Sequence, residues 1–269
     1  MRVLERLQPD QVNPEVYAGI KYNAVRVPKT RDLDRKKAEQ LIKCAAEAYN
    51  YGWGGGVYNT NSSFGNFSYR DGESIITSPT NKNLGKLVPE DLVRVVGWDK
   101  TTSPSTAYYE GNREPTSEVL AHLEINETRP KNNVIVHGHD RLSTQMGPAL
   151  SEYYPRLVSI TKKPEPYGTI ELARNLADLL KENNQYLIAK SHGFFSLGKN
   201  FDEALDSARS MHKAAIMLKI YGKDKRLLSV LDKLNWLDRA SLFLSDTIGS
   251  QVIRLKSGIR GKMDFLAYE

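Results

Sequence analysis

The sequence of 269 residues contains one cysteine, Cys44. A single cysteine cannot form an internal disulfide, so a disulfide-stapled scaffold is excluded and the reducing cytoplasm is the expected location. The same scarcity excludes a metal centre made of several thiolates. Any metal site in this chain must therefore be built from histidine and carboxylate ligands.

Long hydrophobic runs are also lacking. No stretch approaches the roughly 20 apolar residues that a membrane helix needs, and the first residues lack the apolar core of a signal peptide. The formal net charge is +6, which favours anionic ligands such as phosphates, but no nucleic-acid-binding motif accompanies it. We therefore expect neither a membrane nor a nucleic-acid partner. The phosphate-binding P-loop motif is absent as well.

The composition is otherwise that of a globular protein, with 40% hydrophobic and 26% charged residues. We expect an N-terminal extension of loop and short strand over residues 1–32, where prolines interrupt any sustained periodicity. A domain over residues 33–221 follows, and a C-terminal tail over 222–269 combines short helices with a basic segment. The extension packs either on its own domain or on a neighbouring subunit, and the sequence leaves both open.

Apolar spacing and turn residues predict the order of elements within the domain. Helices are expected from Leu33 to Gly52, from Thr116 to about Glu127, over 141–153 with a break at Gly147-Pro148, after Thr169, and from Asn200 to about Tyr221. Strands are expected at 67–69 and 74–77, joined by an Asp71-Gly72 turn, and at 92–98, 134–136, 157–160 and 186–189, with a variable loop over 101–114.

A pair of histidines follows the predicted strand at 134–136. Side chains alternate along a strand, so His137 and His139 should lie on the same face and supply half of a zinc site. Paired histidines also occur as ordinary surface residues. His192, which follows the strand at 186–189, is a third candidate ligand, because open α/β sheets bind ligands at the carboxyl ends of their strands.

The residues Thr116, Ser117 and Glu118 open a helix and have two interpretations. The hydroxyls could cap the helix and the carboxylate could complement its dipole. Free N–H groups and two hydroxyls at a helix N-terminus also form a phosphate site. His122 shares a helix face with Glu118 and is either a competing metal ligand or a core residue, whereas a structural role is expected for His212.

Glycine and asparagine are concentrated in the segment 52–80. The segment is either a glycine-rich β-meander or a place where backbone N–H groups approach an anion closely.

With Gly65-Asn66, Thr116-Ser117-Glu118, His137-Gly138-His139 and Ser191-His192-Gly193 in this order, the chain resembles the class II aldolase/adducin family over roughly residues 33–221. The resemblance implies an α/β fold, a three-layer α/β/α sandwich with a mostly antiparallel central sheet. It also implies a closed ring of subunits, a homotetramer.

The resemblance further implies a role for each motif. His137, His139 and His192 would bind zinc, and Glu118 would be the catalytic acid/base. The substrate phosphate would be bound by the set Asn66, Thr80, Asn81, Thr116 and Ser117. Asn81 departs from the family, which commonly has glycine there. A second proton donor would be a tyrosine, with Tyr153, Tyr154, Tyr167 and Tyr268 as candidates.

The implied reaction is the reversible aldol cleavage of a ketose 1-phosphate to dihydroxyacetone phosphate and an aldehyde. The family's epimerases carry aspartate where this chain has Glu118, which favours carbon–carbon cleavage. The alternatives are a pentulose-phosphate epimerase or dehydratase on the same scaffold, and a metal-free adducin-like interaction module. Adducin-type domains are expected to lack the three histidines.

Overall fold

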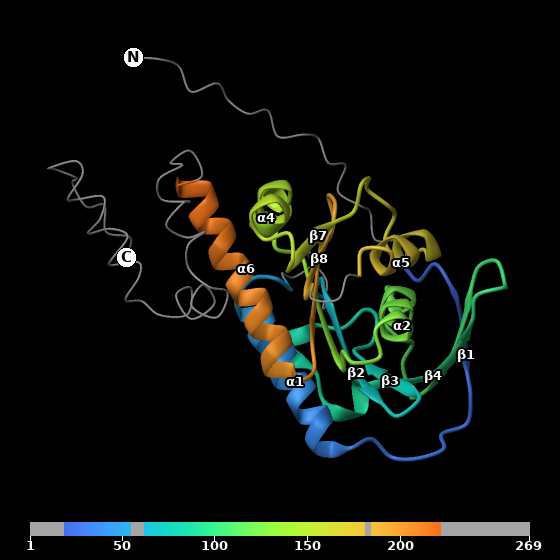
Figure 1. Ribbon diagram of the computed structural model, residues 1–269. Helices are drawn as coiled ribbons and strands as arrows, with labels where there is room; N and C mark the ends of the chain where they lie inside the picture. The colour runs from blue at the N-terminus through green and yellow to red at the C-terminus, as the bar shows by residue number, and fades with distance from the viewer. Residues whose placement is uncertain (1–18, 55–61, 181–183, 222–269) are drawn as a thin grey trace, which may run out of the picture.

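The computed structural model describes residues 19–54, 62–180 and 184–221. Within them a nine-stranded sheet has the strand order β1-β5-β4-β3-β2-β6-β9-β8-β7 (Figure 1). The strands are β1 (Asn23–Arg26), β2 (Asn66–Asp71), β3 (Ser74–Thr77), β4 (Val93–Asp99), β5 (Thr106–Glu110), β6 (Val134–Gly138), β7 (Val158–Ile160), β8 (Tyr186–Ala189) and β9 (Gly193–Gly198).

The sheet is mixed. The outer pairs β1–β5 and β7–β8 are parallel, while the pairs between them are antiparallel. The expectation of a mostly antiparallel sheet is therefore corrected at both edges. Each parallel edge strand reaches its neighbour through a long connection, and the periodicity of a short strand does not reveal its direction.

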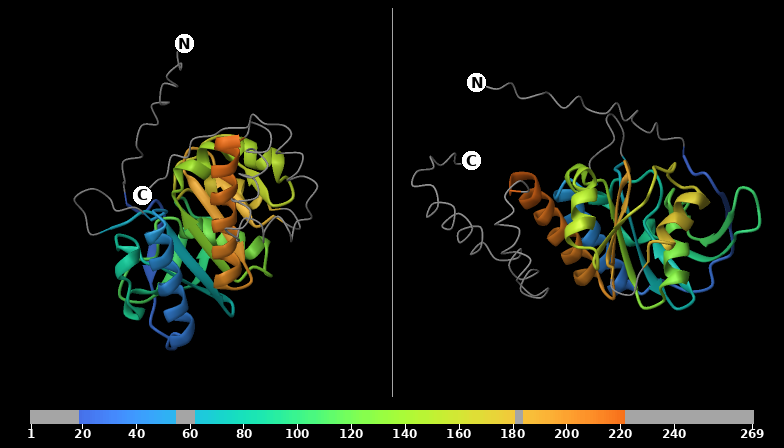
Figure 2. Two further views of the ribbon diagram at one scale, coloured as in Figure 1. Left: turned by 90° about the vertical axis from the view of Figure 1, so that its left-hand side faces the viewer. Right: turned by 45° about the horizontal axis from the view of Figure 1, so that its top comes forward.

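Helices cover both faces of this sheet. They are α1 (Arg35–Asn50), α2 (Val119–Thr128), α3 (Arg141–Gln145), α4 (Gly147–Tyr153), α5 (Ile170–Ala177) and α6 (Phe201–Tyr221), with short 3₁₀ turns at Leu84–Lys86 and Pro89–Asp91. Figures 1 and 2 show α2 and α5 on one side of the sheet and α1, α4 and α6 on the other. None of the helices in the described part of the chain is both long and apolar enough to cross a membrane.

Two hydrophobic clusters fill the space between helices and sheet. Val134 and Val136 of β6 belong to the cluster beneath α1 and α6, whereas Ile135 belongs to the cluster beneath α2 and α5. This alternation follows from the two-residue period of a strand. It places the next odd-numbered residue of β6, His137, on the face that α2 covers.

The predicted helix boundaries are largely confirmed by the capping residues. Asp34 and Thr169 accept hydrogen bonds from the first turns of α1 and α5, and Asn200 Oδ1 accepts from the Glu203 N–H at the start of α6. Gly52 ends the α1 segment with φ +80°. The break at Gly147-Pro148 separates α3 from α4.

Two strands were missed. The predicted loop over 101–114 contains β5, and the segment after His192 forms β9. β9 begins and ends with glycine, which is typical of turns, although the residues between its glycines include three that are fully buried: Phe194, Phe195 and Leu197. Both strands are held by long-range pairing, which a local pattern does not encode.

The described part of the N-terminal extension packs on its own domain. β1 pairs with β5, and the Tyr22 hydroxyl donates to the backbone carbonyls of Pro115 and Thr116. Residues 1–18 and the predicted tail at 222–269 lie outside the described residues.

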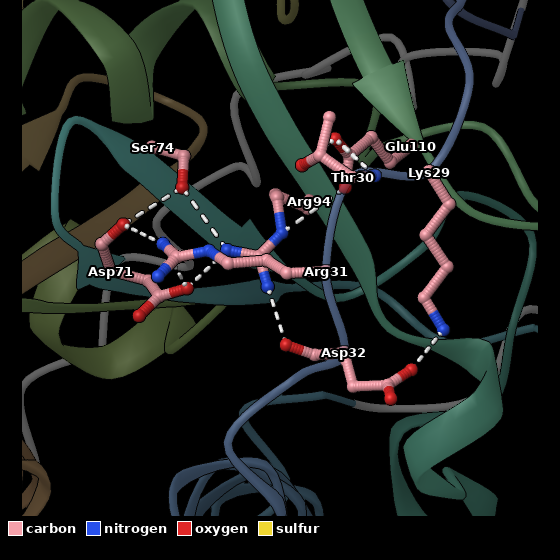
Figure 3. Close-up of polar contacts among 8 residues, drawn as sticks. All are labelled: Lys29, Thr30, Arg31, Asp32, Asp71, Ser74, Arg94 and Glu110. Carbon is pink, nitrogen blue, oxygen red and sulfur yellow. Dashed lines mark hydrogen bonds and ion pairs between the residues drawn. The ribbon is translucent and has the colours of Figure 1, made fainter.

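Arg94 anchors the segment that leads from β1 to α1 (Figure 3). Its side chain is 2% exposed and forms ion pairs with Asp71 and Glu110. One guanidinium nitrogen donates to the backbone carbonyl of Asp32 at 3.0 Å, and the Thr30 hydroxyl donates to Glu110 at 2.6 Å. We call Arg94, Asp71 and Glu110 the Arg94 network; it joins β2, β4 and β5 to the N-terminal segment.

Candidate metal centre

Three histidines from two neighbouring parts of the sheet converge. His137 lies on β6, His139 follows directly after it, and His192 lies in the turn between β8 and β9. Because β6 pairs with β9, the turn lies beside the end of β6. The ring centroids are 5.1 Å apart for His137 and His192, and 4.7 Å apart for His139 and His192.

Glu118 joins these histidines from the start of α2. It occupies the N-cap position, but its side chain makes no capping hydrogen bond. Instead Oε2 lies 2.8 Å from Nε2 of His137, and Oε1 lies 2.9 Å from Nε2 of His192. The carboxylate therefore faces the histidine cluster, and interaction with the helix dipole does not explain its placement.

The orientation of His137 is fixed by a backbone carbonyl. Its Nδ1 lies 2.7 Å from the oxygen of Phe194. A carbonyl only accepts, so Nδ1 carries the proton and donates it. The lone pair of Nε2 is thereby left facing Glu118 and His139, whose Nε2 is 3.1 Å away. A backbone carbonyl behind a histidine is the usual arrangement around a metal-binding imidazole.

The electrostatics of the cluster favour an ionised carboxylate at Glu118 and a neutral ring at His139. Burial opposes ionisation of Glu118, but His137 and His192 lower the pKa of its carboxyl well below the usual value. Burial, together with His192 and His137, lowers the pKa of His139 well below that of free histidine. Neutral imidazole and ionised carboxylate are the forms that bind metal ions.

The donor set fits a divalent metal ion. One ligand atom from each of Glu118, His137, His139 and His192 lies within 4.8 Å of the others. Imidazole nitrogens with a carboxylate oxygen are a ligand combination found in zinc sites. Glu118 is 3% and His137 0% exposed, whereas His139 and His192 are half-buried and form the side nearer to solvent.

His122, the competing ligand candidate, is directed elsewhere. Its ring is fully buried, with Nε2 2.5 Å from Asn66 Oδ1 and Nδ1 2.7 Å from Ser68 Oγ. Asn66 in turn donates from Nδ2 to Glu118 Oε2 at 2.9 Å. His122 is therefore a neighbour of the cluster through Asn66. His212 pairs with Asp140 at 2.7 Å, in agreement with the structural role expected for it.

Two glycines allow the backbone to approach the cluster. Gly65 has φ +83°, and a Cβ there would lie 2.7 Å from the carbonyl oxygen of His137. A Cβ on Gly193 would lie 2.5 Å from the carbonyl oxygen of Gly138 and 2.9 Å from the His137 ring. Side chains at these positions would push β2 or β9 away from β6.

The segments expected to bind phosphate lie side by side. The Thr80 N–H donates to the Glu114 carbonyl at 3.2 Å, and the Thr116 N–H donates to the Ser78 carbonyl at 3.1 Å. Ser78 also donates its N–H to the carbonyl of Phe67 on β2. The turn after β3 is thus placed between the start of β2 and the start of α2.

The residues predicted to bind phosphate differ in their surroundings. Thr116 is buried and its hydroxyl accepts from the Glu118 N–H at 3.4 Å, whereas Ser117 and Thr80 are half-buried. Asn81 is exposed with φ +54°, a left-handed conformation that asparagine tolerates and glycine adopts freely. This conformation explains how asparagine can stand where the family commonly has glycine.

The tyrosine candidates are placed as follows. Tyr154 is buried in the core beneath α6, and Tyr153 packs against that core. The Tyr167 hydroxyl donates to the Gly19 carbonyl at 3.1 Å. Tyr268 lies outside the described residues.

Two features near the cluster were not predicted: a polar row along β2, of which only Asn66 was a predicted site residue, and a phenylalanine ring stacked on His139. Asn66, Ser68 and Arg70 alternate with buried aromatic residues along β2 and face α2, where they contact Glu118, His122 and the Asn126 carbonyl. The alternation of polar and aromatic residues in the sequence could have indicated this row. Phe64 stacks on His139 with ring centroids 4.9 Å apart.

A cavity of about 630 Å³ lies at the other end of β2, between the N-terminal segment and the Arg94 network. Arg94, Arg31 and Lys29 at this cavity are paired with carboxylates. Its lining lacks a histidine. Reactive groups converge instead at Glu118 and the three histidines.

The chain is similar in sequence to known proteins. Residues 39–218 match the Class II Aldolase and Adducin N-terminal domain. An L-fuculose phosphate aldolase of Methanococcus maripaludis is 30% identical over 166 residues, covering 56% of this chain and 82% of the relative. A 3-oxo-tetronate 4-phosphate decarboxylase of Escherichia coli K12 is 25% identical over 205 residues, covering 71% and 89%.

Solved structures show the same fold. An L-fuculose 1-phosphate aldolase superposes with a TM-score of 0.55 at 20% identity, covering 77% of this chain and 100% of the other. YgbL of Escherichia coli, described as a putative aldolase/epimerase/decarboxylase, gives 0.55 at 21% identity, covering 71% and 91%. With the profile match spanning more than half of its length, the chain belongs to the class II aldolase and adducin family.

Proposed function

We propose that this protein is a zinc-dependent lyase that reversibly cleaves a ketose 1-phosphate to dihydroxyacetone phosphate and an aldehyde. The observation that carries the proposal is the position of Glu118, whose two carboxylate oxygens each contact one histidine of the cluster. A base held beside a metal site is what an aldol cleavage requires.

His137, His139 and His192 would hold the zinc ion. When bound, the ion would supply a Lewis acid for the oxygens of the substrate. Three neutral imidazoles would leave further coordination positions for those oxygens.

Glu118 would move the proton. Its carboxylate, kept ionised by the neighbouring histidines, would take the proton from the substrate hydroxyl whose oxygen becomes the aldehyde. The carbon–carbon bond then breaks, and Glu118 returns the proton to the carbon of the ketone product. Its burial at 3% exposure keeps bulk water from competing for that proton.

The substrate phosphate would lie where the start of β2, the turn after β3 and the start of α2 meet. The proposed set is Asn66, Thr80, Asn81, Thr116 and Ser117. Backbone N–H groups at the start of α2 would add to the attraction, because a helix N-terminus carries a partial positive charge.

Decarboxylation is the second candidate reaction, because the Escherichia coli decarboxylase is matched over more of this chain than the archaeal aldolase. Loss of carbon dioxide leaves electrons on a carbon next to a carbonyl, as aldol cleavage does, but it does not need a base to remove a hydroxyl proton. An epimerase or dehydratase acting on a pentulose phosphate would use the same metal and phosphate sites. A metal-free interaction module is disfavoured by the four convergent ligand atoms.

The test is a substrate panel. Zinc-loaded protein is incubated with ketose 1-phosphates, and dihydroxyacetone phosphate is assayed. In parallel, 3-oxo-tetronate 4-phosphates are supplied and carbon dioxide is measured. We expect dihydroxyacetone phosphate from at least one ketose. Carbon dioxide release alone would establish the decarboxylase, and neither product with metal bound would refute both.

We also propose a cytoplasmic homotetramer arranged as a closed ring. Such an assembly would place the half-buried side of the cluster, His139 and His192, near a subunit boundary. Light scattering at assay concentration is the test, and a monomeric mass would contradict the ring.

A further inference from the structure

We propose that His122 is a positioning residue that sets the orientation of the Glu118 carboxylate through the side chain of Asn66. This inference rests on the proposed function, because it assigns His122 a part in the work of Glu118. It concerns a residue that neither belongs to the metal cluster nor lies among the residues proposed to touch substrate.

The observation is a continuous chain of hydrogen bonds from β2 through α2 to the metal cluster. Ser68 Oγ lies 2.7 Å from His122 Nδ1, and His122 Nε2 lies 2.5 Å from Asn66 Oδ1. Asn66 Nδ2 lies 2.9 Å from Glu118 Oε2. We call these four residues the Glu118 relay.

The orientation of the Asn66 amide sets the donor and acceptor roles at the centre of this relay. Its Nδ2 faces the Glu118 carboxylate and donates to it, and its Oδ1 faces His122. Oδ1 only accepts, so Nε2 of His122 carries the proton. In the neutral ring Nδ1 then carries no proton and accepts a hydrogen bond from the hydroxyl of Ser68.

The relay is buried, so its hydrogen-bonding groups have no alternative partner in solvent. Ser68 and His122 are 0% exposed and Asn66 is 3% exposed, so water cannot replace a lost partner. Burial, with a contribution from His137, lowers the pKa of His122 to about 3, so the ring stays neutral at physiological pH. A neutral ring with its proton on Nε2 satisfies both hydrogen bonds of His122.

His122 affects Glu118 because the side-chain amide of Asn66 has a donor end and an acceptor end. The side chain of Asn66 can rotate to exchange Oδ1 and Nδ2. While His122 donates from Nε2, rotation of the Asn66 amide would point its N–H groups at the Nε2–H of His122 and its Oδ1 at the Glu118 carboxylate. Both contacts would be repulsive. Without that donor, Oδ1 is no longer held, and Glu118 loses a fixed partner for the oxygen that faces His137.

The helix geometry makes His122 suited to this role. Glu118 and His122 are four residues apart, so they lie on the same face of α2. Asn66 and Ser68 are two apart on β2 and point to the same face of the sheet. Asn66 and Ser68 on the strand therefore face Glu118 and His122 on the helix.

The first experiment does not depend on turnover. Protein labelled with ¹⁵N in its histidine rings is studied by NMR at neutral pH, and the His122 signals are assigned by their loss in His122→Gln. We expect Nε2 to show the shift of a protonated nitrogen and Nδ1 that of an unprotonated one. A proton on Nδ1, or a cationic ring, would overturn the relay whatever the protein catalyses.

The second experiment separates positioning from stability. His122→Phe keeps an aromatic ring beside Phe195 but removes the donor to Asn66. We expect kcat to fall about 10–100-fold with little change in KM, and the affinity for zinc, measured by chelator competition, to fall by a similar factor. His122→Gln places an amide N–H near the position of Nε2 and should restore most of both.

Two further variants control for lost stability and for the case in which His122→Phe does not fold. Leu176→Ala removes a buried side chain of α5, the helix packed against α2, and controls for lost stability. It should leave kcat and zinc affinity near wild type at temperatures where it remains folded. If His122→Phe does not fold, Ser68→Ala removes only the far hydrogen bond of the relay and should lower both kcat and zinc affinity by a few-fold; wild-type values of both would overturn the relay.

The outcomes are distinguishable from failure of the proposed function. Wild-type turnover with unchanged kcat and zinc affinity in His122→Phe would overturn the relay while the lyase stands. If the wild type shows no turnover on any substrate, the NMR of the histidine rings and the zinc affinity still test the Glu118 relay. Unchanged zinc affinity in His122→Phe would then overturn the relay.

Discussion

Asn66 and His137 lie opposite each other in the β2–β6 pair, and both contact the same oxygen of Glu118, at 2.9 and 2.8 Å. Side chains opposite each other on antiparallel strands point to the same face. The pairing register therefore fixes the position of the carboxylate. A slip by one residue would turn one of the two side chains to the other face of the sheet.

Replacing Glu118 by glutamine tests its catalytic role. Glutamine keeps the shape but cannot accept and return a proton. We expect turnover to fall roughly 10²–10⁴-fold, the usual value of general acid–base catalysis, with folding and zinc content retained. Steady-state kinetics and elemental analysis are the measurements. Cleavage at a near wild-type rate would remove the main reason for preferring an aldolase to its relatives.

The metal assignment is tested by single alanine variants at His137, His139 and His192. Each removes one ligand of a small set, so bound zinc should fall severely in all three. His212→Ala is the control, because His212 pairs with Asp140 and is outside the cluster. Full zinc in the three variants, or equal loss in the control, would argue against the site.

Gly65 and Gly52 allow a matched test of how closely the backbone is packed near the site. Both have positive φ, at +83° and +80°, but a Cβ on Gly52 meets nothing within 4 Å, whereas one on Gly65 lies 2.7 Å from the His137 carbonyl. Gly52→Ala should cost about 1–2 kcal/mol of unfolding free energy. Gly65→Ala should cost about 2–5 kcal/mol and weaken zinc binding, since β6 must move. Urea unfolding and chelator competition are the measurements; equal losses would contradict the steric account.

Neutral His122 should make stability depend on pH. Burial lowers its pKa in the folded protein to about 3, against an ordinary value of 6.5. Below pH 6.5 the unfolded chain binds a proton that the folded protein does not. The stability is therefore fully present above pH 6.5 and is lost as pH falls toward 3, by up to about 1.4 kcal/mol per pH unit.

The measurement is urea unfolding of zinc-free wild type and His122→Gln between pH 7 and pH 4.5. Glutamine does not titrate, so the difference between the two proteins isolates His122. The advantage of wild type should shrink as pH falls. A difference that stays constant would mean that the ring is already charged or is hydrated in the folded protein.

The Arg94 network should matter for stability and not for chemistry. Arg94→Met leaves Asp71 and Glu110 without their buried cation, which should cost about 3–5 kcal/mol in unfolding free energy. Turnover per folded molecule should be unchanged, because Arg94 lies at the other end of β2 from Asn66. Denaturant unfolding and kcat on the same preparation check both statements. Arg35→Met, which removes only an exposed pair with Glu39, is the matched control and should cost less than about 1 kcal/mol.

Local patterns in the sequence predicted the helices, most of the strands and the types of reactive residue. The β-branched run 134–136 formed β6, and its period of two placed His137 on the face beneath α2. Thr169 and Asn200 predicted helix starts, because short polar side chains satisfy the free N–H groups there. The scarcity of cysteine limited any metal site to histidine and carboxylate.

Which of these residues meet depends on contacts between segments that are far apart in the sequence. Pairing of β6 with β9 brings His192 to His137, and pairing with β2 brings Asn66 to Glu118. The parallel edges, the strand β5 and the role of His122 as a partner of Asn66 likewise came from contacts between distant segments. The physical reason is that hydrophobic period and capping are read from neighbouring residues, whereas strand order and register depend on how the whole chain buries its apolar faces.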